Sequence, residues 1–238
     1  MWLLKSSVGR KVIMSVSGLA LILFLLFHMS MNLVALFSGE AYNMVCEFLG
    51  ANWYALIATA GLAALVVVHF VYAFILTMQN KKARGTQSYD YTKQPKEVEW
   101  ASQNMFVLGL IVILGMGLHL YNFWANMQLV EILHKLGVHV DGVALAADGA
   151  HYIKETFSCI VYVIVYLVWL VALWFHLTHG FWSEMQTLGW NNQVWFNSWR
   201  CIGNVVVTLI ILGFLAVVVA GFFGLGALGT IECAGACC

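Results

Sequence analysis

Five long stretches of the chain contain no charged side chain, and this pattern restricts the folds that it can adopt. Each stretch exceeds the roughly 20 residues that a helix needs to cross the hydrocarbon of a bilayer. Backbone groups in hydrocarbon need hydrogen bonds within the protein, and the sequence lacks the alternation typical of a membrane β-barrel. The composition agrees, because only 9% of the residues are charged, against roughly 25% in soluble domains. We therefore predict an all-α, polytopic membrane protein with a single membrane domain, residues 1–238, and five transmembrane helices at about 12–37, 53–79, 102–127, 155–182 and 202–228.

The basic residues indicate how the chain is oriented in the membrane. Nine of the eleven Lys and Arg residues fall at the N-terminus or in alternate connections, and only Lys135 and Lys154 fall on the other side. Basic residues gather on the cytoplasmic side of membranes. We therefore expect a protein of the cytoplasmic (inner) membrane, with its N-terminus in the cytoplasm and its C-terminus outside. No segment outside the bilayer is long enough to bury its own core, so the chain is expected to anchor other subunits.

Histidines are the ionisable residues that lie within the uncharged stretches. Three of the eight histidines belong to the outer connection 128–153, where we expect them to be solvated: His134, His139 and His151. The other five lie inside the predicted spans: His28, His69, His119, His176 and His179. Ionisable residues inside a membrane indicate function by default, because their burial is costly.

Depth in the membrane groups four of these histidines into two pairs. His28 and His119 each lie 17 residues after the start of an outward-running helix, which corresponds to about 25 Å of rise. His69 and His176 lie on inward-running helices, 12 and eight residues before the charged residues that end them. Alternate helices of an up-down bundle face each other across its core. The sequence therefore predicts an outer pair from the first and third helices and an inner pair from the second and fourth.

Two facing imidazoles across a gap as wide as a porphyrin indicate bis-histidine ligation of haem iron. Zinc would normally recruit three or four ligands, with Cys or carboxylate among them. Iron with both axial positions filled is suited to electron transfer, so we predict two haem b groups. Gly18 and Gly109 each precede an outer ligand by ten residues, about 15 Å, which places them at the depth of the inner haem. They would let a macrocycle approach the backbone; ordinary small-residue packing between helices is the alternative.

The stretch WFHLTHGFWSEM contains two histidines three residues apart, His176 and His179. Both face the same side of a helix. His176 matches the depth of His69 better, so we predict it as the ligand. His179 lies one turn nearer the cytoplasm, where a haem propionate, a quinone head group or water could meet it.

Four motifs together resemble a known family. LLFHMSMNL, VVVHFVYAF, LGMGLHLYNFW and WFHLTHGFW, in this order, spacing and depth, are similar to the helices that bind haem in the dihaem cytochrome b subunit of succinate dehydrogenase and fumarate reductase. The resemblance covers nearly all of the five spans and weakens in the outer loops and the C-terminal tail. It implies the same ligand pairs, His28 with His119 for the outer haem and His69 with His176 for the inner one.

The resemblance also implies partners and a reaction. An iron–sulfur subunit would dock on the cytoplasmic face and contact a flavoprotein that carries FAD and the dicarboxylate site. The chain would then belong to a succinate:quinone or quinol:fumarate oxidoreductase in the lipid bilayer and exchange electrons with menaquinone. A dimer of such complexes is compatible with the family, and nothing indicates nucleic acid as a partner.

Several further residues are candidates for roles at these sites. Quinol oxidation releases protons, so a carboxylate at the quinone site is useful as a base. The resemblance favours Glu47 in the connection after the first helix, with Glu40 or a merely solvated acid as alternatives. Inner-haem propionates are expected near Ser15, Ser17 or Arg10. Some relatives carry a Glu two residues before the ligand of the fourth helix; Trp174 occupies this position, and the sequence predicts no acid within any span.

Two other functions remain open from the sequence. The membrane cytochrome of a hydrogenase or a formate dehydrogenase would share the chemistry but have other soluble partners. A proton relay or a transporter without cofactor would also use buried histidines, although transporters usually show intramembrane acids and helices broken by proline. The tail cysteines Cys233, Cys237 and Cys238 are compatible with a disulfide, a metal or a disordered terminus.

Overall fold

The computed structural model describes residues 6–84, 100–190, 192 and 194–231, and all regular structure within these ranges is helical. Five helices are long and apolar enough to cross a membrane, which confirms the predicted fold class at this level. They are α2 (Ser7–Phe37), α4 (Trp53–Arg84), α5 (Trp100–His119), α8 (Ile160–Thr187) and α9 (Phe196–Phe223). The central part of the connection 81–100 and the tail cysteines lie outside the described residues.

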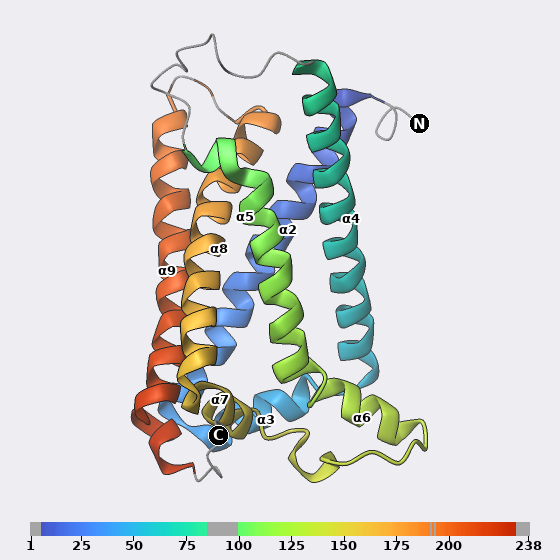
Figure 1. Ribbon diagram of the computed structural model, residues 1–238, viewed down its shortest axis with the longest axis vertical. Coiled ribbons are helices and arrows are strands. Elements are labelled where there is room, and N and C mark those ends of the chain that lie inside the picture. Colours follow the sequence, from blue (N-terminus) through green and yellow to red (C-terminus); the bar gives the residue numbers. More distant parts are fainter. Residues whose placement is uncertain (1–5, 85–99, 191, 193, 232–238) are drawn as a thin grey trace.

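The long helices form one bundle, in which α2 crosses obliquely while the others run more nearly along its long axis (Figure 1). The short helices α3 (Gly39–Phe48), α6 (Gln128–Lys135) and α7 (Gly149–Ser158) gather at one end of this bundle, which we call the α3 end (Figure 1). The described chain starts at the opposite end and finishes at the α3 end. The π-helix η2 (Leu120–Trp124) and two 3-10 turns, η3 (Val143–Leu145) and η4 (Gly226–Thr230), complete the helical elements.

Local sequence signals explain several helix ends. The Ser6 hydroxyl accepts a hydrogen bond from the Gly9 amide at 2.9 Å, and the Ser38 hydroxyl caps α3 in the same way. Gly224 ends α9 with a φ of 63°, a left-handed conformation that favours glycine. The fourth and fifth spans differ most from the expected 155–182 and 202–228. The chain breaks at Cys159 between α7 and α8, and α8 then continues to Thr187, while α9 runs from Phe196 to Phe223.

Polar side chains hold the short helices together at the α3 end. The Asn43 amide donates to Asp148 Oδ1 at 2.8 Å, while the Ala150 amide donates to Asn43 Oδ1 at 3.0 Å. Glu131 on α6 accepts a hydrogen bond from the Ala51 amide at 2.7 Å. These contacts join segments far apart in the chain, and they lie where α4 and α7 begin.

The protein core lies mainly between α2, α8 and α9. Ile22, Leu177 and Val207 are buried together in one cluster, and Val217 with Tyr166 belong to a second cluster nearer the α3 end. By contrast, the most apolar 18-residue stretch of α4 contains no buried residue, and that of α5 is only 11% buried. Helix α4 packs chiefly against α2. The two helices that carry His69 and His119 are therefore the least covered by protein.

Candidate functional site

The 69/176 pair joins α4 to α8. The ring centroids of His69 and His176 lie 6.4 Å apart, with an angle of 68° between the ring planes. Both residues are half-buried. His179, in contrast, packs edge-on against Trp182 with a centroid distance of 5.2 Å. The structure thus brings His69 together with His176, the residue that the depth argument favoured.

The 28/119 pair joins α2 to α5. The ring centroids of His28 and His119 are 5.8 Å apart, with an interplanar angle of 82°. Aromatic rings surround this pair: Phe24 stacks on His28 at 5.5 Å, and Trp169 lies 5.8 Å from His119. The Asn32 amide, 3.5 Å from the His28 ring nitrogens, donates to the His28 carbonyl at 2.8 Å. All four histidines thus form two pairs, each linking two different helices.

A hydroxyl group sets the tautomer of His69. The Ser17 hydroxyl donates its proton to the Met14 carbonyl oxygen at 2.9 Å. Ser17 Oγ also lies 3.1 Å from His69 Nδ1. Since this hydroxyl has only one proton to give, it accepts from an Nδ1–H group. In this arrangement His69 carries its proton on Nδ1, which leaves the lone pair of Nε2 for another partner.

The two glycines predicted at the inner depth both lie beside the 69/176 pair. A Cβ atom on Gly18 would be 3.2 Å from His69 Cε1, and one on Gly109 would be 3.6 Å from His176 Cε1. Gly18 also contacts the carboxyl group of Glu184. A larger side chain at Gly18 would therefore have to displace Glu184 or His69.

Glu184 corrects the expectation that the spans contain no acidic residue. Helix α8 continues beyond the predicted end at residue 182, and Glu184 lies in its last turn with only 7% of its surface exposed. Its Oε2 atom is buried and has no hydrogen-bond partner among the described residues. The absence of a side chain at Gly18 creates the space that this carboxyl group fills.

The donor set suits a metal ion held by two imidazoles. The ring centroids lie 5.8 and 6.4 Å apart in the two pairs, so both imidazoles of a pair could bind one metal ion. The Ser17 contact leaves His69 with a free Nε2 lone pair, as a ligand requires. The Nδ1 atom of His176 is buried without a hydrogen-bond partner in the described part of the chain. No group of three or more His, Cys, Asp or Glu side chains among the described residues could hold a metal, so the two-ligand pairs are the arrangement to consider.

The packing also suits a large flat cofactor. No residue in the most apolar stretch of α4 is fully buried by the described part of the chain. Gly109 leaves the backbone beside the His176 ring without a side chain, as the close approach of a macrocycle would require, whereas the space beside Gly18 is filled by the Glu184 carboxyl group. The paired histidines are the residues that would hold the iron of such a cofactor: His28 with His119 and His69 with His176.

The other predicted site residues lie in varied surroundings. Ser15 is buried on α2, Arg10 is half-buried one turn nearer the chain start, and Trp174 donates its indole N–H to Thr208 on α9 at 3.0 Å. Glu47 and Glu40 are exposed on α3. Their roles stay predictions.

The π-helix beside the 28/119 pair was not foreseen. It begins at Leu120, directly after His119, and the Ala125 amide donates to the Leu120 carbonyl at 2.8 Å. Such insertions often mark functional sites. The buried Asn122 inside it donates to the Tyr166 hydroxyl at 3.2 Å. The run LYNFW contains neither Gly nor Pro, so it carries no local signal for this turn.

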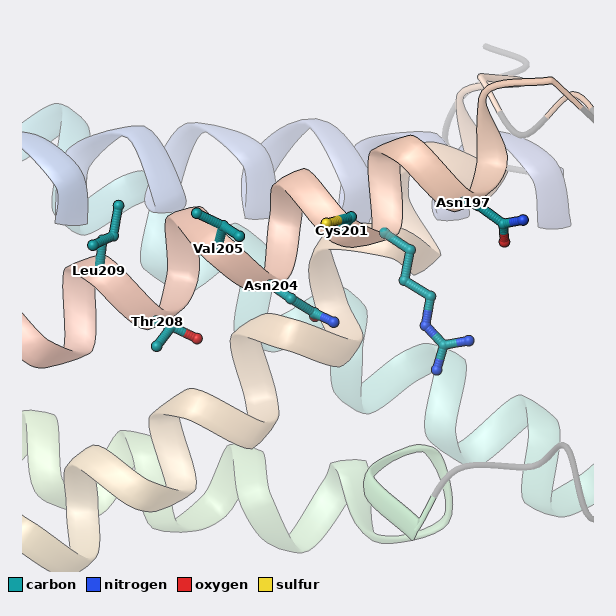
Figure 2. Close-up of a pocket in the computed structure, with 7 residues that line it drawn as sticks. Asn197, Cys201, Asn204, Val205, Thr208 and Leu209 are labelled. Atoms are coloured by element: carbon teal, nitrogen blue, oxygen red, sulfur yellow. The ribbon is translucent and has the colours of Figure 1, made fainter.

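Two cavities lie outside the histidine pairs. One, about 350 Å³, is almost wholly apolar and lies between α2 and α3, with Phe27 and Met31 on one side and Met44 and Phe48 on the other. The other, about 540 Å³, is a shallow groove along α9 (Figure 2).

Comparisons of the chain with protein-family models, with curated proteins and with solved structures found no match.

Proposed function

We propose that the chain is the membrane-anchor dihaem cytochrome b of a succinate:quinone or quinol:fumarate oxidoreductase. The observation that carries this proposal is the pairing of four histidines from four membrane helices, with ring separations of 5.8 and 6.4 Å. Haem b, when bound, supplies a one-electron carrier. The four imidazoles hold it, the surrounding aromatic and aliphatic side chains exclude water, and Ser17 orients His69.

The two pairs lie at different depths, as transfer across a membrane requires. Helix α2 passes both pairs: Ser17 contacts His69, and His28 follows 11 residues later, about 16 Å farther along the helix. An electron carrier at each pair would divide the transfer across a hydrocarbon layer of about 30 Å into shorter steps. The protein therefore offers an electron route between an outer quinone site and subunits at the cytoplasmic face.

We place menaquinone near α3. The apolar cavity between α2 and α3 is lined by Phe27, the neighbour of His28 in the chain, and by Phe48, the neighbour of Glu47. An isoprenoid quinone suits such a lining, since binding sites for apolar ligands combine hydrophobic walls with few polar groups. Glu47 would accept a proton that quinol releases on oxidation.

The soluble partners are an iron–sulfur subunit and a flavoprotein that carries FAD. Affinity purification of the tagged chain from its native membrane tests this assignment. Bound FAD, iron–sulfur clusters and oxidation of the dithionite-reduced cytochrome on addition of fumarate are expected. Co-purification with a hydrogenase or a formate dehydrogenase, without FAD-linked fumarate activity, would reassign the chain to the other class of membrane cytochrome.

Removing the Ser17 hydroxyl should weaken haem binding at the 69/176 pair. In Ser17→Ala, His69 loses the acceptor that fixes its tautomer, and loss of such a partner typically lowers metal affinity about 10- to 100-fold. Ser17→Thr keeps the hydroxyl and should restore the native behaviour. Haem titration of the apoprotein, read with the midpoint potential of each redox component, measures the effect. An unchanged affinity and potential in Ser17→Ala would show that the contact does not orient the ligand.

A further inference from the structure

The groove along α9 carries a row of polar residues on a membrane helix. Asn197, Arg200, Asn204 and Thr208 all line it, three or four residues apart and therefore on one helix face. Figure 2 shows Asn204 and Thr208 on neighbouring turns, with Asn197 near the start of the helix. The row lies on the helix whose most apolar 18-residue stretch has the highest mean hydropathy of the five membrane helices, 3.0.

The lining of the groove changes from charged to apolar along the helix. Arg200 is exposed near the start of α9. Trp190 and Trp199, whose rings lie 5.5 Å apart, mark the same end, and tryptophan is enriched at the membrane–water boundary. Farther along, Val205 and Leu209 line the groove with 53% and 58% of their surface exposed. This order matches the order of head group and acyl chain in a lipid.

Asn204 lies between these two regions. It follows Arg200 by four residues, about 6 Å deeper. Its side chain is exposed, and its amide has no hydrogen-bond partner in the ranges that the structure describes. An amide facing hydrocarbon without a partner costs several kcal/mol by transfer from water. An occupant of the groove with oxygen acceptors at this depth would satisfy the Asn204 amide.

We propose that the groove binds an anionic phospholipid. The phosphate contacts Arg200 and Asn197, the glycerol ester oxygens accept hydrogen bonds from Asn204, and an acyl chain lies along Val205 and Leu209. The proposal does not rest on haem binding or on the function proposed above.

A second copy of the chain fits this face less well. Closely packed membrane helices use small residues at their contact. The glycines within α9 instead face the protein's own bundle: Gly203 contacts Phe181, Gly213 contacts Met29 and Gly221 contacts Phe157.

Competition between two lipids tests the site. The purified protein is placed in nanodiscs with equal amounts of phosphatidylglycerol and phosphatidylcholine, and retained lipid is counted by native mass spectrometry. The wild type should retain phosphatidylglycerol preferentially. Arg200→Gln should lower this preference about fivefold, the effect of one basic residue near an anionic head group. Asn204→Leu should lower retention of both lipids about fivefold, because the lost hydrogen bond goes to ester groups that they share.

Lys82→Gln is the matched control, since Lys82 is an exposed cation at the end of α4, away from the groove. It should leave the lipid ratio unchanged. A native ratio in Arg200→Gln, or an equal loss in Lys82→Gln, would overturn the proposal.

The exposed thiol of Cys201 in the groove tests the alternative of a second copy. The other free cysteine of the described residues, Cys46, should not interfere. Burial raises the pKa of Cys46 to about 11, so its thiol stays protonated and unreactive near neutral pH. Oxidative cross-linking of two wild-type chains that disappears in Cys201→Ser would place a second copy on this face and overturn the lipid site. Identical behaviour of the wild type and Cys201→Ser supports the lipid.

Discussion

Replacing His69 with alanine should remove about half of the haem b from the purified protein, and replacing His176 should remove the same redox component. The reason is geometric: the two ring centroids lie 6.4 Å apart, and either substitution would leave the proposed haem iron with one protein ligand. His28→Ala and His119→Ala should each remove the other component, because their rings form the second pair at 5.8 Å. Haem content per chain and a potentiometric titration of each variant measure this outcome.

His179→Ala is the matched control for this series. It removes a histidine from the same helix, one turn from His176, but the His179 ring packs on Trp182 rather than on another histidine. It should therefore retain the full haem content and both redox components. Loss of one component in His179→Ala, or loss of the same component in His69→Ala and His119→Ala, would contradict the pairing.

The second large effect is expected at the quinone site. Glu47→Gln should slow the reduction of the cytochrome by a menaquinol analogue about 100-fold, the typical contribution of a general base. The substitution keeps the shape of an exposed side chain, so haem content and fold should not change. Stopped-flow measurement of cytochrome reduction by quinol, with dithionite reduction as a check on haem integrity, gives the rate.

Glu40→Gln provides the control for Glu47. Glu40 lies in the first turn of the same helix α3 and is equally exposed, but its neighbour at the cavity is the small Ala41, whereas Glu47 adjoins the large Phe48. Its rate of quinol oxidation should stay within about twofold of the wild type, as for a solvated surface acid. If Glu40→Gln were slow and Glu47→Gln fast, the base would be Glu40. If both were fast, no acid of α3 would take part.

Much of the fold follows from chemistry that the sequence displays directly. A run of uncharged residues long enough to cross a bilayer has to be helical, so the five spans could be predicted. The helix bounds were harder, because tertiary contacts decide them. The break at Cys159 and the extension of α8 to Thr187 depend on how α7 and α2 pack, and periodicity does not report that.

Some features of the candidate site could likewise be predicted from the sequence, and others could not. Depth along straight helices was enough to pair His69 with His176, since helical rise is constant. The role of Ser17 was missed: the sequence placed it near a propionate, whereas its hydroxyl contacts the His69 ring. The charge of Glu184 indicates the membrane surface in the sequence, yet the side chain is buried in the structure. Both differences arise from the oblique crossing of α2, which brings Gly18 and Ser17 against α4 and α8 (Figure 1).

The most direct test of the central claim is the dithionite-reduced minus oxidised absorption spectrum of the folded, monodisperse protein, combined with a count of haem per chain. The proposed function predicts the α-band of b-type haem and about two haems per chain, each with two histidine ligands. A folded protein from haem-replete cells that shows no b-type α-band would contradict the haem assignment, and with it the electron-transfer function.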